Sequence, residues 1–152
     1  MNTIATPWAA FPRGDATVAT DLLAQILTMT AEAWVVVEPV PDEQRRGMFR
    51  KAKGSPYSAT ISPYADDEEP HAIAYVTFPK GAVFSDRGLA LPSWAVLDDE
   101  AKDDATLRMP IATPPGEMIA LAIAALDSCS DAPLGDAWRA CIGDTYVGKP
   151  GY

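Results

Sequence analysis

The side chains best suited to nucleophilic chemistry in this chain are one histidine, His71, and two cysteines, Cys129 and Cys141. A serine or cysteine nucleophile needs a neighbouring base, so His71 would have to serve any such mechanism. Cys129 lies between two serines and lacks the charged neighbours that lower a thiol pKa. No serine stands in a G-x-S-x-G motif. We therefore predict no catalytic residue, an exposed histidine at the start of a strand, and free, partly buried thiols.

Two acidic runs could supply the oxygen ligands that calcium and magnesium prefer. They contain Asp66, Asp67, Glu68 and Glu69 in the first run and Asp98, Asp99, Glu100, Asp103 and Asp104 in the second. Neither run has the spacing of an EF-hand loop, and the chain has neither a C-x-x-C motif nor a second histidine for zinc. Its glycines match neither of the two common phosphate-binding loops. We predict no metal site and no cofactor.

The same acidic runs suit a second role, as a surface that binds another protein. With 21 Asp and Glu against 12 Lys and Arg, the chain has a formal net charge of −9 at pH 7. Such a charge repels nucleic acid and anionic membranes and favours a partner with a basic surface. The two runs would then speed association and orient the partner. Solubility alone is the alternative explanation of the charge.

One segment opposes this trend, because it places five cations close together in an acidic chain: Arg45, Arg46, Arg50, Lys51 and Lys53. The flanking residues predict a hairpin with strands over 47–52 and 57–62. Alternation along the first strand places Arg50 on one face and Lys51 and Lys53 on the other, which weakens the case for a single nucleic-acid surface. The cations either pair with the acidic runs or form a patch for an anion or an acidic partner.

The spacing of hydrophobic residues predicts the helices that position these charges. Apolar residues at helical spacing predict an amphipathic helix over 16–32, with Asp15 or Thr17 as its N-cap. A second helix, apolar on nearly every side, follows an N-cap at Thr113 and ends within 127–133. We expect a short third helix over 134–142.

Strands are predicted from β-branched and alternating segments. They cover residues 34–40, 47–52, 57–62, 71–78, 93–97 and 106–111. The last two flank the acidic run 98–104 as a loop, for which a helix over 99–107 is the alternative. Residues 1–14 are expected to form an irregular arm and residues 144–152 a loose tail.

This order of elements predicts a single α+β domain over residues 1–152. Its mainly antiparallel sheet of five or six short strands is packed by an N-terminal amphipathic helix and a buried C-terminal helix. No signal peptide is recognised, and the longest uncharged apolar stretch, 118–126, is shorter than the roughly 20 residues that span a bilayer. We therefore expect a cytoplasmic protein without a membrane partner.

The function predicted from these features is non-enzymatic protein binding, by an inhibitor, an immunity-type protein or a chaperone-like adaptor of bacterial or phage origin. The element order and the acidity are similar to those of type III secretion chaperones and toxin-immunity proteins, with no shared residue motif. One alternative is an enzyme of unfamiliar type that uses Asp, Arg and Tyr residues. Another is an anion- or nucleic-acid-associated protein that acts through the basic hairpin 45–53. The partner and the oligomeric state stay open.

Overall fold

The computed structural model describes residues 5–28, 32–41, 55–64, 70–79, 81 and 83–144. These residues form seven strands, two α-helices and a short 3-10 helix, η2. Their order is β1 (Ala9–Pro12), α1 (Thr17–Leu27), β2 (Ala33–Pro39), β3 (Ser58–Tyr64), β4 (His71–Thr77), η2 (Phe84–Arg87), β5 (Val96–Glu100), β6 (Asp104–Pro110), α2 (Pro115–Ser128) and β7 (Ala137–Asp144).

The seven strands belong to one antiparallel sheet with the order β1-β7-β2-β3-β4-β6-β5. Strands β2, β3 and β4 are neighbours both in sequence and in space, whereas β7 enters the sheet between β1 and β2. Strand β7, the last described strand, therefore pairs with β1 on one edge and with β2 on the other. The predicted α+β fold with a mainly antiparallel sheet is confirmed, with seven strands in place of five or six.

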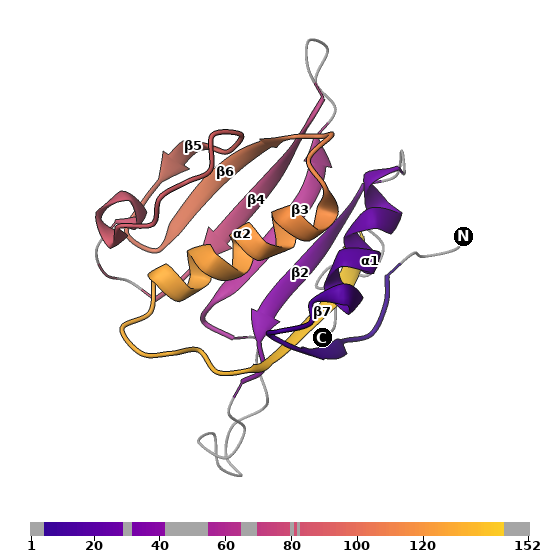
Figure 1. Cartoon of the computed structure of the whole chain (residues 1–152), viewed down its shortest axis with the longest axis horizontal. Helices are drawn as coiled ribbons and strands as arrows, with labels where there is room; N and C mark the ends of the chain where they lie inside the picture. Colours follow the sequence, from indigo (N-terminus) through magenta and orange to yellow (C-terminus); the bar gives the residue numbers. More distant parts are fainter. Residues whose placement is uncertain are drawn as a thin grey trace.

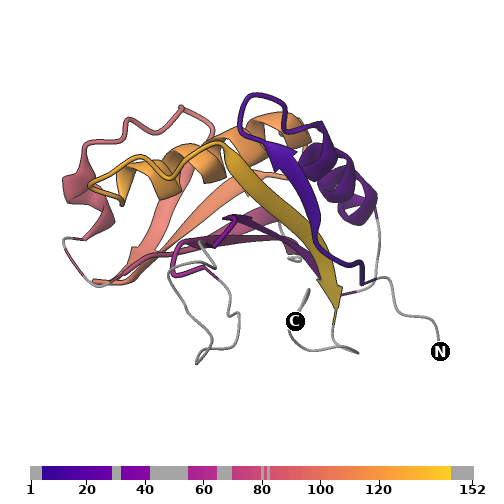
Figure 2. The same ribbon diagram turned by 90° about the horizontal axis from the view of Figure 1, so that it is seen from below.

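Both α-helices pack on the same face of the sheet (Figure 1). In the view turned by 90°, α1 and α2 lie on one side of the sheet, and no described helix lies on the other (Figure 2). Helix α1 buries Ala19, Leu23 and Ile26, whose spacing places them on one side of the helix. Helix α2 buries residues around most of its circumference, including Met118 and Leu126. The predicted buried C-terminal helix is thus confirmed.

The strands contribute alternate residues to the core beneath these helices. In β4, Ala72, Ala74 and Val76 are buried, whereas Tyr75 between them is exposed. This alternation is the pattern that a strand with one covered face requires. The sheet therefore has a helix-covered face and a second face whose side chains point away from the helices.

The segment 134–142, predicted as a short helix, instead enters strand β7. Ala137 and Ala140 favour a helix, but ladders to β1 on one edge and to β2 on the other satisfy the backbone of this segment. Gly135 has a φ of 86°, and this left-handed turn leads directly into the strand. The helix prediction was wrong because strand pairing outweighed local helix propensity.

The predicted irregular arm contains strand β1, which pairs with β7 and buries Phe11. Helix α1 is shorter than predicted, and its N-cap is Ala16 instead of Asp15 or Thr17. Asp15 nevertheless binds the first helical residue, because its Oδ1 accepts hydrogen bonds from the Thr17 amide at 3.2 Å and the Thr17 hydroxyl at 2.6 Å. At helix α2 the N-cap is Pro114, one residue beyond the predicted Thr113.

The second strand of the predicted hairpin, 57–62, is present as β3, but its neighbours in the sheet are β2 and β4. Residues Ala59–Ile61 of β3 pair with β2 on one edge and with β4 on the other, so neither edge is free for 47–52. The segment 47–52 itself lies outside the described residues, as does the predicted tail beyond Asp144. Asp144 is the last residue of β7.

Candidate functional site

One face of the sheet points away from α1 and α2 (Figure 2). On strands β3 to β6 the register assigns polar, aromatic and acidic side chains to this face. Residues that pair across neighbouring strands point to the same face, so the register fixes the members of this surface. We name it the open face. It comprises Ser58, Thr60, Ser62 and Tyr64 of β3, His71, Ile73, Tyr75 and Thr77 of β4, Asp104, Thr106, Arg108 and Pro110 of β6, and Val96 and Asp99 of β5.

The open face exposes apolar surface. The described residues include five exposed large hydrophobic side chains, and three of them lie here: Tyr64 at 53%, Tyr75 at 43% and Val96 at 45%. Ile73 is half-buried between them on β4. The placement of three such side chains on one face of one sheet is more informative than single exposed hydrophobics, which are common on protein surfaces.

The register arranges these side chains in cross-strand rows. Tyr75 pairs with Thr60 on one side and Thr106 on the other, and Thr106 pairs with Asp99. In the next row, Ile73 pairs with Arg108, which pairs with Val96. The row on the opposite side of Tyr75 contains Thr77 and Asp104. Because rows on one face follow at two-residue steps, the surface runs from an apolar region at Ile73 and Val96 to an acidic one at Asp104.

The acidic run 98–104, predicted as a loop, is a strand hairpin. Asp98, Asp99 and Glu100 belong to β5, and Asp104 begins β6. The connecting turn is closed by a hydrogen bond of 2.8 Å from the Ala101 amide to the Asp104 carbonyl. A register shift between Leu97 and Asp99 leaves Asp98 without a partner in the ladder. The loop prediction was wrong because this run supplies the paired ends of both strands.

Two of the five carboxylates in this hairpin, Asp98 and Glu100, bind Arg108 of β6 and Ser85 of η2. Asp98 forms an ion pair of 3.3 Å with Arg108. Glu100 accepts hydrogen bonds from the amide and the hydroxyl of Ser85 in η2, both at 2.8 Å. These contacts offset the charge of Asp98 and fix Glu100 to the neighbouring 3-10 helix.

Of the other three carboxylates, Asp104 contacts the Tyr75 hydroxyl, and the charges of Asp103 and Asp99 act on it from farther away. The hydroxyl donates a hydrogen bond of 2.9 Å to Asp104. This bond, burial, and the charges of Asp104, Asp103 and Asp99 raise the pKa of Tyr75. Within the described ranges, none of the three carboxylates forms an ion pair. We name Asp99, Asp103 and Asp104 the acidic cluster.

The other charged groups predicted from sequence lie outside the described residues. These are the first acidic run, Asp66, Asp67, Glu68 and Glu69, and the basic segment, Arg45, Arg46, Arg50, Lys51 and Lys53. The second acidic run is the only group of predicted binding residues within the described ranges, and it lies at one end of the sheet. Sequence reasoning missed the neighbouring Tyr75 and Val96, although the alternation within 71–78 carried a signal for Tyr75.

The sequence analysis also did not predict the buried ion pair of Glu38 on β2 and Arg139 on β7. Glu38 is fully buried, and its Oε2 accepts hydrogen bonds from Arg139 at 2.7 and 3.1 Å and from the Ser55 amide at 3.0 Å. The Arg139 guanidinium lies over the Trp8 ring, 4.1 Å from its centroid. Glu38 Oε1 is buried without a hydrogen-bond partner. This cluster joins four segments distant in sequence and is built to hold the fold together.

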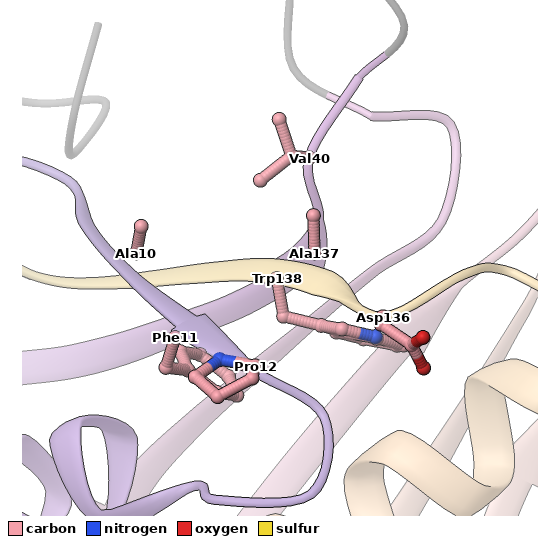
Figure 3. Close-up of a pocket in the computed structure, with 7 residues that line it drawn as sticks. All are labelled: Ala10, Phe11, Pro12, Val40, Asp136, Ala137 and Trp138. Atoms are coloured by element: carbon pink, nitrogen blue, oxygen red, sulfur yellow. The ribbon is translucent and has the colours of Figure 1, made fainter.

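A shallow hollow of about 400 Å³ lies where β1 meets the start of β7 (Figure 3). Its lining is mostly apolar and includes Phe11, Pro12, Val40, Ala137 and Trp138, with Asp136 as its acidic member. Such a lining can hold an apolar side chain.

His71 and the two cysteines, the residues best suited to nucleophilic chemistry, do not contact one another in the structure. His71 is half-buried at the start of β4, with its ring 5.0 Å from the ring of Tyr64. Both cysteines are free and buried. Burial raises the pKa of Cys129, and burial together with the charge of Glu38 raises the pKa of Cys141 to about 12. Both thiols are therefore protonated at neutral pH, which is the less nucleophilic state.

Two further features bear on the kind of site. Within the part of the chain that the structure describes, no three His, Cys, Asp or Glu side chains gather closely enough to hold a metal ion. No described helix is long and apolar enough to cross a membrane.

Comparison with known proteins gives no match: no family model, no curated protein and no solved structure is similar to this chain.

Proposed function

We propose that this protein is a non-catalytic binding module whose partner is a protein with a basic surface. Inhibitors, immunity-type proteins and chaperone-like adaptors are the classes that this description fits. The observation that carries the proposal is the acidic cluster, in which three carboxylates without an ion pair among the described residues belong to the turn end of the β5–β6 hairpin. Two free buried thiols fit a reducing compartment, so we place the protein in the cytoplasm.

The acidic cluster supports binding for an electrostatic reason. Like charges held close together repel one another, and a cationic partner relieves that repulsion. The formal net charge of −9 adds a long-range attraction for a basic protein, which raises the association rate and orients the encounter. Screening extends over roughly 8–10 Å at physiological salt, so the affinity of such a complex falls as the salt concentration rises.

The protonated thiols support binding over cysteine-based catalysis. A thiol with a raised pKa is a weak nucleophile at neutral pH. His71 contacts Tyr64 instead of a cysteine. The described surface therefore offers charge and apolar area to a partner and no activated nucleophile to a substrate.

A library of random dodecapeptides displayed on phage tests the proposal while the partner is still unidentified. Selection on the wild-type protein should enrich peptides with a net positive charge. Their affinity should fall at least about tenfold for the variant Asp99→Asn/Asp103→Asn/Asp104→Asn and should fall with rising salt.

The matched control is Asp21→Asn/Asp86→Asn/Glu117→Gln, which removes three exposed carboxylates on α1, η2 and α2. Both triple variants change the net charge equally, so a difference between them reports the position of the charges. Enrichment of neutral or acidic peptides, no enrichment, or equal affinity for the two variants would contradict the proposal.

A further inference from the structure

We infer that the partner docks on the open face across β4, β6 and β5, and that it presents an arginine to Tyr75 and the acidic cluster beside an apolar side chain on Ile73 and Val96. This inference rests on the proposed function and adds the location and the chemistry of the contact. The occupant is thus a basic segment of the partner protein that also carries an apolar or aromatic residue.

The two faces of the sheet are covered unequally by the described helices. Both α-helices pack on the opposite face, and no described helix lies over the open face (Figure 2). The exposed side chains Tyr75 and Val96 belong to neighbouring rows of this face. Strands in a sheet are about 4.8 Å apart, so β4, β6 and β5 together present a surface about 10 Å wide. That width accommodates one extended or helical segment.

Charge is distributed unevenly along this surface. Arg108, in the row of Ile73 and Val96, is held by Asp98 at 3.3 Å, so its charge is already offset. The acidic cluster at the other end has no such partner within the described ranges. A docked cation is therefore attracted to the hairpin end, while the row of Ile73 remains available for apolar contact. This polarity gives the partner segment a direction.

The Tyr75 ring and the carboxylate beside it favour one kind of cation. The Tyr75 hydroxyl points toward Asp104, to which it donates its hydrogen bond, and the Tyr75 side chain is 43% exposed. A guanidinium can stack on such a ring and donate two parallel hydrogen bonds to a carboxylate. An ammonium group is a point charge that cannot make both contacts in this way. The combination of an exposed aromatic ring and adjacent carboxylates therefore fits arginine better than lysine.

The edge of the sheet is a poorer docking site than its face. Edge strand β5 carries Asp98, Asp99 and Glu100 and has a register shift within its five residues. Charges and irregular register on an edge strand discourage the addition of another strand. The partner is thus expected to contact side chains on the face and not the backbone of β5.

Substitutions on the open face test the inference with a peptide selected as described above. Val96→Asn and Tyr75→Ser should each weaken its binding at least about tenfold, because central apolar and aromatic contacts dominate interface energies. The matched control for the first is Val18→Asn, which changes an exposed valine of α1. Replacement of the peptide's arginines by lysines should weaken binding severalfold. Far-ultraviolet circular dichroism checks the fold of each variant, and Val96→Asn decides the test if Tyr75→Ser does not fold.

The outcomes separate this inference from the proposed function. If Val96→Asn and Val18→Asn bind the peptide equally while the acidic-cluster variant loses it, the docking site on the open face is wrong and the basic partner stands. If lysine peptides bind as well as arginine peptides, the preference for arginine is wrong. If all variants bind equally, both proposals fail.

Discussion

At the scale of single residues, the ion pair of Glu38 and Arg139 is the contact on which the fold depends most. A fully buried carboxylate is costly unless its partners stay in place, and Glu38 has three donors on one oxygen and none on the other. The Arg139 side chain is only 17% exposed and lies against Trp8. Removing one member of the pair leaves the other charge buried.

We therefore expect Glu38→Ala to lower the free energy of unfolding by about 3–5 kcal/mol, as for other broken buried pairs. Urea denaturation measures the change. The double variant Glu38→Leu/Arg139→Met removes both charges together and should recover much of that loss. A loss below about 1 kcal/mol for Glu38→Ala would show that the pair is not buried as described.

The thiol of Cys141 makes the free energy of unfolding depend on pH in the alkaline range. Burial raises its pKa in the folded protein from 9.0 to about 12. Because the folded state holds this proton more tightly than the unfolded state does, the stabilisation is complete below pH 9 and is lost as the pH rises toward 12. Cys141→Val should reduce the fall in unfolding free energy between about pH 8 and about pH 10.5, values that bracket the onset of this loss. Urea denaturation at the two pH values measures it, and an unchanged slope would contradict the assignment.

At the scale of elements, an ion pair joins the β1–α1 turn to the end of α2. Arg13 donates two hydrogen bonds to Asp127, at 2.7 and 2.8 Å, and its guanidinium lies 5.3 Å from the centroid of the Trp138 ring. A carboxylate in the last turn of a helix is unfavourable to the helix dipole, and Arg13 offsets it. Each side chain is 32% exposed, so solvent reduces the strength of the pair.

Arg13→Ala should accordingly lower the melting temperature by a few degrees, equivalent to about 1 kcal/mol. The double variant Arg13→Ala/Asp127→Asn should be more stable than Arg13→Ala, because no unpaired carboxylate remains at the helix end. Differential scanning calorimetry compares the three proteins. A double variant no more stable than the single one would show that the charge of Asp127 does not matter.

Elements with a distinctive local apolar pattern were predictable from the sequence, and elements defined by long-range pairing were not. Helix α2 and strands β2 and β4 follow directly from their apolar patterns. Strand β7 was predicted as a helix because its residues favour a helix locally, and its two partner strands are distant in the sequence. The short β1 was missed for the same reason, since only its pairing with β7 distinguishes it from an irregular arm.

At the scale of the whole molecule, the fold divides its surface into a side covered by α-helices and an open face with an acidic end. The sequence predicted Asp99, Asp103 and Asp104 as binding residues, and the structure places them together. The sequence did not predict that Tyr75 and Val96 would lie on the same face of the sheet as Asp99 and Asp104. Alternation indicates that a strand has two faces, but the arrangement of both helices decides which of the two they cover.

The position of a bound basic peptide on the protein tests the central claim most directly. An arginine-containing peptide from the selection is titrated into isotopically labelled protein, and amide chemical shifts are followed by NMR. We predict that the largest changes fall on β4, β5 and β6, centred on Tyr75, Thr106 and Val96. Changes centred on α1, on α2 or on the hollow around Val40 would contradict the account.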